Sequence, residues 1–144
     1  MSDTLQLEKQ LCFRLYSVNK AMNRLYAPML KELGLTYPQY LVMLALWDKP
    51  KAVTVKQLGE MLDLDSGTLS PLLKRMEKQA LLHRSRSEFD ERSVQVSLSA
   101  HGKNIRSKAK LIPAKMFAKT GLPLDEFLML NNKLDQLLTR LSES

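Results

Sequence analysis

Apolar residues near the N-terminus recur at alternating steps of four and three residues, the spacing of one face of a helix. They are Leu11, Leu15, Val18, Met22, Leu25 and Met29. This near-heptad stripe suits a long helix that pairs with other helices, so we expect a helix from about residue 5 to about residue 33. Pro28 predicts a kink or a new turn within it, and Gly34 is suited to close its C-terminal end.

Two capping boxes and a turn predict the elements that follow. Thr36–Gln39 and Thr54–Gln57 each place a threonine three residues before a glutamine, so each is expected to open a helix. After the second of these helices, Asp63–Asp65 predicts a tight turn, and Ser66 is then expected to cap a longer helix that runs to about Ala80. This order is typical of a helix-turn-helix.

The apolar period then changes from helical to alternating. Val94, Val96 and Leu98 alternate with polar residues, which predicts a half-buried strand. Residues 82–86 are expected to form the other arm of a β-hairpin, with residues 87–92 as its polar connection.

Two more helices are expected toward the C-terminus. Ser99 is suited to cap the first, which should be about twenty residues long and end near Gly121. The second follows Pro123, and its apolar stripe consists of Phe127, Leu130, Leu134, Leu137 and Leu141.

We therefore predict a mainly α fold with a small β-hairpin: a winged helix-turn-helix whose N- and C-terminal helices form a homodimer interface. One domain is expected over residues 1–144, with the winged helix-turn-helix at about 37–98 and dimerisation helices at about 5–33 and 100–142. No apolar segment follows Met1, and no run of about 18 apolar residues occurs, so we expect a cytoplasmic protein with no membrane partner.

Positive charge is concentrated in one part of the chain. Lys and Arg number 22 against 15 Asp and Glu, a net charge of +7. Between residues 74 and 110, ten basic and four acidic residues leave +6, nearly all of that charge. Together with the predicted fold, this excess favours double-stranded DNA as the partner.

The helix after the turn has two different faces. Its expected buried face consists of Leu69, Leu72, Leu73, Met76 and Ala80. The opposite face carries short hydroxyl side chains and cations, which suit base edges and phosphates in a major groove. Arg92 near the hairpin tip can enter a minor groove, with Asp90 as its brace. The candidate DNA-binding residues are Ser66, Thr68, Ser70, Pro71, Lys74, Arg75, Arg86, Asp90 and Arg92.

Cys12 is the single cysteine, so no intramolecular disulfide can form. It starts a second stripe along the first helix, made of Cys12, Tyr16, Asn19, Asn23 and Tyr26. Cys12 and Tyr26 are fourteen residues apart, about 21 Å along a helix, so they can meet only if two copies pack antiparallel. We therefore expect a thiol site built by two subunits. A helix that starts near Leu5 would place Cys12 past the first turn, where the helix dipole has faded.

Three stretches resemble a known family. Residues 90–102, with Asp-x-Arg at Asp90 and Arg92, resemble the wing of MarR-family regulators, and residues 65–76 resemble that family's recognition helix. Residues 11–16, Tyr26 and residues 35–41 are similar to OhrR, the organic hydroperoxide-sensing repressors of that family.

The resemblance implies a homodimer that binds a palindromic operator and releases it when an organic hydroperoxide oxidises the N-terminal cysteine. Carried onto this chain, Cys12 is the sensing thiol, Tyr26 and Tyr37 hold the thiolate, and Tyr16 lies beside it. One branch of the family has a second cysteine after the wing, but residues 109–120 contain none. Oxidised Cys12 is therefore expected to react with a low-molecular-weight thiol or to oxidise further.

Three other interpretations stay open or are disfavoured. Each cation alone can be ordinary surface charge on an amphipathic helix. An enzyme is disfavoured, because the chain has no glycine-rich phosphate loop, and His83 and His101 with one cysteine make no metal site. We expect no cofactor and no catalytic residue. A MarR-type repressor released by a small phenolic ligand in the dimer crevice, with Cys12 silent, is the alternative function.

Overall fold

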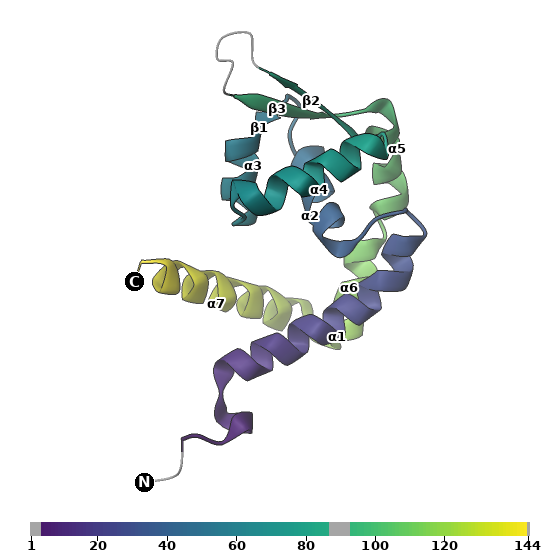
Figure 1. The fold of residues 1–144 in the computed structure, drawn as a ribbon. Coiled ribbons are helices and arrows are strands. Elements are labelled where there is room, and N and C mark those ends of the chain that lie inside the picture. The colour runs from purple at the N-terminus through teal and green to yellow at the C-terminus, as the bar shows by residue number, and fades with distance from the viewer. Residues whose placement is uncertain (1–3, 87–92, 144) are drawn as a thin grey trace. The chain divides into compact units, whose positions relative to one another are not determined.

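The computed structural model describes residues 4–86 and 93–143, and the chain divides into two compact units (Figure 1). The elements of Met1–Lys110 are η1 (a 3-10 helix, Leu7–Lys9), α1 (Leu11–Lys31), α2 (Tyr37–Trp47), β1 (Val53–Thr54), α3 (Val55–Leu62), α4 (Ser66–Lys78), β2 (Leu82–Arg86), β3 (Val94–Leu98) and α5 (Ala100–Ala109). Those of Leu111–Ser144 are α6 (Ile112–Thr120) and α7 (Leu124–Ser142). Among the described residues, no helix combines the length and the apolar character needed to span a membrane.

Three of the four predicted helix caps are present. Thr36 Oγ1 accepts from the Gln39 N–H at 3.3 Å, and Gln39 Oε1 accepts from the Thr36 N–H at 3.1 Å. Thr54 and Gln57 form the same reciprocal pair at 2.9 and 3.0 Å. Ser99 caps α5 with its side chain. Each cap satisfies N–H groups that the first turn of a helix leaves unpaired.

The turn between α3 and α4 depends on one glycine and two aspartates. Asp63 adopts a left-handed conformation with φ of 55°, which aspartate tolerates. A Cβ at Gly59 would lie 2.7 Å from the Leu64 carbonyl oxygen, so only glycine permits this close approach. The N-cap of α4 is Asp65, and the prediction of Ser66 as the cap is wrong by one residue. The carboxylate one position earlier bonds the free N–H and suits the positive end of the helix.

Helix α4 ends at Lys78, before the predicted Ala80. Ala80 has φ of 60°, and the N–H groups of Ala80 and Leu81 donate to the carbonyls of Glu77 and Met76 at 3.0 Å each. This is a Schellman turn, which reverses the chain into β2. Ala80 is exposed, contrary to the predicted buried face, because a left-handed residue leaves the helix.

The predicted hairpin is present and has a third strand. The sheet is antiparallel in the order β1-β3-β2, and Leu82 lies opposite Leu98 at the end of the hairpin away from its connection. Strand β1 was not predicted, because a strand of two residues shows no period. The candidates Asp90 and Arg92 lie in residues 87–92, outside the described part of the chain.

The core of the first unit lies among α2, α3, α4 and the sheet. Its most deeply buried side chains include Val42, Met43, Leu58, Leu69, Leu73, Met76, Leu82 and Val96. The predicted buried face of α4 is thus confirmed at residues 69, 72, 73 and 76. The Trp47 indole donates to the Gly102 carbonyl at 2.9 Å, which ties the end of α2 to α5.

Helix α1 begins at Leu11, not near residue 5. The preceding residues form a separate turn, in which the Gln10 amide donates to the carbonyl oxygens of Thr4 and Gln6 at 2.6 and 3.0 Å. Pro28 lies inside α1 without ending it.

The predicted twenty-residue helix after Ser99 is two helices, α5 and α6. Pro113 explains the break, because its nitrogen has no hydrogen to donate to the Ala109 carbonyl and its ring crowds that carbonyl. Helix α5 accordingly ends at Ala109. In the second unit, the rings of Phe117 and Phe127 meet edge to face at 4.9 Å.

Candidate nucleic-acid interface and thiol site

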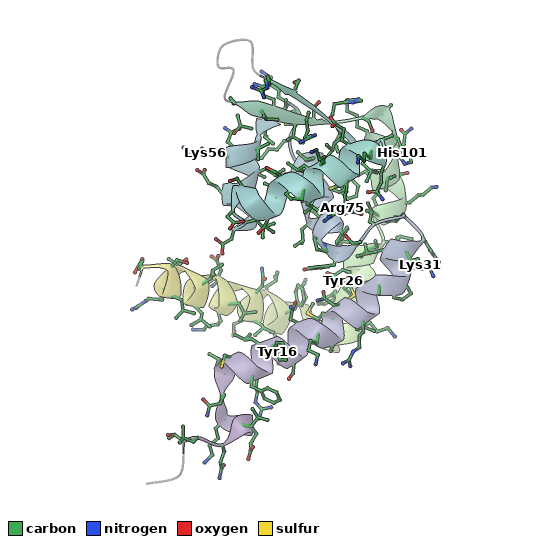
Figure 2. All side chains as sticks on the ribbon, viewed as in Figure 1. Tyr16, Tyr26, Lys31, Lys56, Arg75 and His101 are labelled. Carbon is green, nitrogen blue, oxygen red and sulfur yellow. The ribbon has the colours of Figure 1, made fainter. Side chains whose placement is uncertain are left out.

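The solvent-facing side of α4 gathers six of the candidate DNA-binding residues. Ser66, Thr68, Ser70, Pro71, Lys74 and Arg75 are all exposed. The hydroxyl side chains occupy the N-terminal half, where free N–H groups and the helix dipole favour an anion. The two cations follow in the C-terminal half, and Figure 2 marks Arg75 there. Arg86, at the end of β2, is also exposed.

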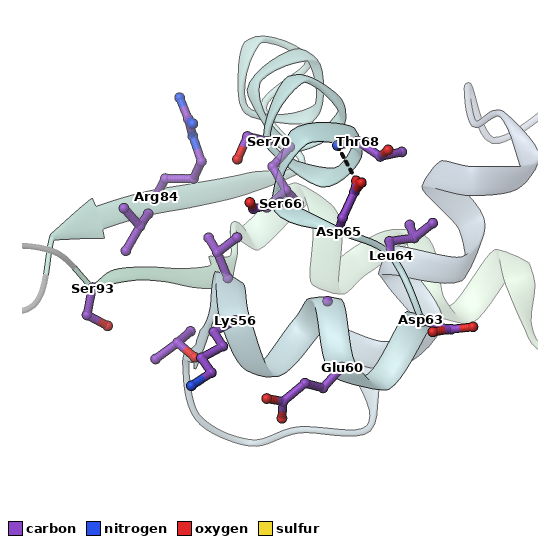
Figure 3. A pocket seen from close by; sticks show the side chains of 15 residues that line it. Lys56, Glu60, Asp63, Leu64, Asp65, Ser66, Thr68, Ser70, Arg84 and Ser93 are labelled. Carbon is purple, nitrogen blue, oxygen red and sulfur yellow. Dashed lines mark hydrogen bonds between the residues drawn. The ribbon is translucent and has the colours of Figure 1, made fainter. Parts of the chain in front are cut away.

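A hollow of about 1250 Å³ opens between α3, α4 and the described base of the hairpin. Lys56 of α3, Arg84 of β2 and Ser70 of α4 line it (Figure 3). Asp65 lines it as well, and hydrogen bonds from the side chain and backbone of Thr68 hold the pKa of Asp65 below its ordinary value of 3.8. The hollow is therefore lined by hydroxyl groups, by the cations Lys56 and Arg84, and by the carboxylates of Glu60, Asp63 and Asp65.

Glu77 and Arg84 join the recognition helix to the hairpin. The Glu77 carboxylate accepts from the Arg84 backbone N–H at 2.9 Å and from its guanidinium at 3.1 and 3.3 Å. These bonds, the backbone bond first, hold the pKa of Glu77 below its ordinary value of 4.5. The sequence did not reveal this pair, because the two residues lie on different elements with no shared period.

Cys12 is exposed and is the second residue of α1. The expectation that it lies past the first turn is wrong, because residues 4–10 do not continue the helix. Backbone N–H groups in this first turn have no acceptor within the helix. Within residues 4–86 and 93–143, no group of three His, Cys, Asp or Glu side chains is placed to hold a metal ion.

Three tyrosines cluster where α1 meets α2. The ring of Tyr26 lies 5.1 Å from that of Tyr37 and 5.7 Å from that of Tyr40, between centroids. Burial is the main cause that raises the pKa of Tyr26, and it raises the pKa of Tyr40 to about 12. Both hydroxyls therefore keep their protons at neutral pH and can donate hydrogen bonds. Sequence reasoning missed Tyr40, because it lies in an apolar helix where a tyrosine has no distinguishing signal.

One chain does not bring Cys12 to this cluster. Cys12 lies near the start of α1 and Tyr26 is fourteen residues further along it, and Figure 2 shows Tyr16 and Tyr26 at separate points on the helix. Tyr16 is 60% exposed, with the Lys20 ammonium 5.0 Å from its ring centroid. Beside the cluster, the buried Asn23 Oδ1 has no hydrogen-bond partner within the described residues. The thiol and the tyrosines are thus two separate parts in a single chain.

The helix-turn-helix with its adjoining hairpin defines the class: this is a winged helix-turn-helix protein. A family model described as transcriptional regulator SarA/Rot matches residues 24–109. An organic hydroperoxide resistance transcriptional regulator of Bacillus subtilis strain 168 is 45% identical over 141 residues, which are 98% of this chain and 95% of that protein.

Solved structures of similar regulators have the same fold. AbfR of Staphylococcus epidermidis is 34% identical with a TM-score of 0.76, over 96% of this chain and 95% of that one. A mutant MarR from E. coli, solved with operator DNA, is 25% identical with a TM-score of 0.83, over 95% of this chain and 99% of that one. The chain therefore belongs to the MarR/OhrR family of winged-helix transcriptional regulators. The predicted fold class and the prediction that the chain is not an enzyme are confirmed.

Proposed function

We propose that this regulator is a homodimeric repressor that binds a palindromic operator and releases it after an organic hydroperoxide oxidises Cys12. The observation that carries the proposal is the exposed Cys12 in the first turn of α1, in a chain 45% identical to an organic hydroperoxide resistance regulator. Two relatives support the DNA-binding part of the proposal, because structures of reduced AbfR and of a mutant MarR were solved with DNA bound.

In this proposal α4 enters the major groove, which is about 12 Å wide. Ser66, Thr68 and Ser70 approach base edges and phosphates, with Pro71 beside them. Lys74, Arg75 and Arg86 neutralise the DNA backbone, and Arg92, with Asp90 as its brace, reaches a minor groove.

Two copies are needed to complete the thiol site. Antiparallel pairing of two α1 helices would carry Cys12 of one copy to Tyr26 and Tyr37 of the other. Exposed leucines along α7 support an interface between copies, because an apolar face of this extent favours burial. The unpartnered Asn23 oxygen on the same side of α1 as Tyr26 fits a site that a second copy completes.

The chemistry requires a thiolate and hydrogen-bond donors. The Cys12 sulfur attacks one peroxide oxygen, the O–O bond breaks, and the leaving alkoxide takes a proton to become an alcohol, so the sulfur is oxidised to sulfenic acid. The hydroxyls of Tyr26 and Tyr37 donate to the thiolate, and Tyr16 lies one turn from Cys12. A low-molecular-weight thiol then forms an S–S bond with the sulfenic sulfur, and water leaves.

We propose that the bulk of this mixed disulfide, rather than oxidation alone, separates the two reading heads from their half-sites. One relative, overoxidised AbfR, is solved bound to DNA, and this supports the proposal because that oxidised protein keeps its DNA. A bond between the two Cys12 residues of a dimer is not expected, because a disulfide needs Cα atoms within about 7 Å. Antiparallel helices would hold the two thiols far apart.

The test is operator affinity measured by fluorescence anisotropy, on a duplex selected from random DNA by the reduced protein. Peroxide plus a small thiol should weaken binding by the wild type and leave Cys12→Ser bound. Intact mass should show one added thiol per chain, and a non-reducing gel should show no covalent dimer. Full release of Cys12→Ser by peroxide would refute the sensor. Release by a phenolic ligand with Cys12 still reduced would favour the alternative function.

A further inference from the structure

Gln39 lies between the tyrosine cluster and the recognition helix. It belongs to the same turn of α2 as Tyr37 and Tyr40, both of which contact Tyr26. Its side chain is 5% exposed, and its amide Nε2 donates to Gln79 Oε1 at 3.0 Å. Gln79 is the C-cap of α4, the helix that carries the candidate DNA-binding residues.

The capping box determines which way the Gln39 amide points. Its Oε1 must face the Thr36 N–H, at 3.1 Å, to cap α2. The amide nitrogen is then directed away from the cap and toward Gln79. Glutamate would serve the cap equally well, but it has no N–H to donate. The cap could be formed by either residue. Only glutamine at position 39 also donates the hydrogen bond to Gln79 at the end of α4.

The far end of the link is equally well defined. The Gln79 N–H donates to the Arg75 carbonyl at 3.1 Å, and the Schellman turn follows directly. Glu77, two residues before Gln79, holds β2 through Arg84. A displacement of Gln79 therefore acts on the end of the recognition helix and on the hairpin together.

We propose that Gln39 is a positioning residue that transmits the state of the tyrosine cluster to the recognition helix through Gln79. This inference rests on the proposed function, because it takes the cluster as the place where oxidised Cys12 of a second copy acts. When an adduct on that sulfur displaces Tyr26 or Tyr37, the N-terminal turn of α2 moves, and the Gln39–Gln79 hydrogen bond moves the end of α4. A hydrogen bond between packed helices is a short contiguous route for such coupling.

The test compares operator affinity in the reduced and fully oxidised states for wild type and three variants. Gln79→Ala removes the acceptor and leaves the cap on α2 intact, because Gln79 is exposed and takes no part in it. Gln79→Glu is the matched control, since a carboxylate still accepts from the Gln39 amide. A second disrupting variant, Gln79→Met, keeps the length of the side chain but offers the Gln39 amide no oxygen acceptor.

The quantity to compare is the ratio of oxidised to reduced Kd, with Cys12 oxidation confirmed by mass. Both disrupting variants should oxidise at the wild-type rate and bind DNA within about twofold of wild type when reduced. Their Kd ratio should fall by about two- to tenfold, the factor that one hydrogen bond supplies, and Gln79→Glu should keep the wild-type ratio.

The outcomes separate the two proposals. If the wild type releases DNA on oxidation and Gln79→Ala releases it equally, this inference is overturned and the sensor stands. If fully oxidised wild type keeps its operator, the proposed function fails, and the inference fails with it. A change in thermal stability alone would not alter the ratio, so a purely structural role for Gln39 would also leave it at the wild-type value.

Discussion

Ala80 carries a backbone strain that its side chain creates. It occupies the left-handed position of the Schellman turn with φ of 60°, where a Cβ crowds the neighbouring carbonyl. We expect Ala80→Gly to raise the free energy of unfolding by about 0.5–1 kcal/mol, because relief of the strain exceeds the added freedom of the unfolded chain. Urea denaturation measures this. Ala27→Gly, at an exposed position in α1, is the control and should destabilise by a similar amount.

Tyr40 should make stability fall at high pH. Its pKa is raised to about 12 in the folded chain, whereas an unfolded tyrosine ionises near 10. Between these values the unfolded state has lost a proton that the folded state keeps, so the free energy of unfolding decreases as pH rises. Urea denaturation from pH 9 to about pH 11.5 should show this decrease, and Tyr40→Phe should flatten it. Tyr16→Phe, at an exposed position, should leave the decrease unchanged. If the free energy of unfolding fell with pH at the same slope in all three proteins, burial of Tyr40 would not be its cause.

At the scale of elements, side-chain bonds near the ends of helices join one element to the next. Glu77 bonds the Arg84 backbone and guanidinium and thereby holds β2 against the end of α4. Glu77→Ala removes a negative charge, so charge alone would tighten DNA binding. If the bond positions the hairpin, affinity should instead weaken several-fold in an anisotropy titration. Glu60→Ala, at an exposed acid that lines the hollow and makes no such bond to the hairpin, should bind as tightly as wild type or more tightly.

Acidification should loosen the same bond. In the folded chain the pKa of Glu77 lies below its ordinary value of 4.5. The bonds of Glu77 to Arg84 therefore stabilise the fold above pH 4.5, and this stabilisation is lost as pH falls through the folded-state pKa. Unfolding of the wild type should therefore become easier below about pH 4.5, and Glu77→Gln should show less of this dependence. Identical acid profiles for the two proteins would mean that Glu77 does not hold the hairpin.

For the whole molecule, the exposed apolar side of α7 predicts the oligomeric state. Its exposed residues include Leu124, Leu128, Met129, Leu130, Leu134, Leu138 and Leu141. Replacing Leu138 and Leu141 together by aspartate should shift the mass measured by light scattering from that of two chains to that of one chain. Met61→Asp, at an exposed apolar residue of α3, should keep the dimer. A wild-type protein of single-chain mass at micromolar concentration would contradict the proposed dimer.

Replacing Leu138 and Leu141 by aspartate should also alter the footprint on DNA. A dimer should protect two half-sites about 10 base pairs apart, whereas the α7 variant should protect one half-site weakly or none. Two full half-sites protected by a single-mass protein would contradict the proposed mode of binding.

Elements whose signals are local could be predicted from the sequence. Capping boxes at Thr36 and Thr54 and the two faces of α4 depend on residues within a few positions of one another, so their spacing was sufficient. The third strand and the break before Pro113 were missed, because the first is too short to show a period and the second interrupts a stretch that otherwise favours helix.

The fold class, the charged side of the recognition helix and the candidate sensing thiol could be predicted from the residues of the chain. The contacts between groups on different elements could not, and they are known only from the folded chain. In the folded chain Gln39 bonds Gln79, the ring of Tyr40 packs near that of Tyr26, and Cys12 lies in the first turn of α1. The physical reason is that hydrophobic periodicity records which face of an element is buried, whereas contacts between elements depend on packing that no local spacing encodes.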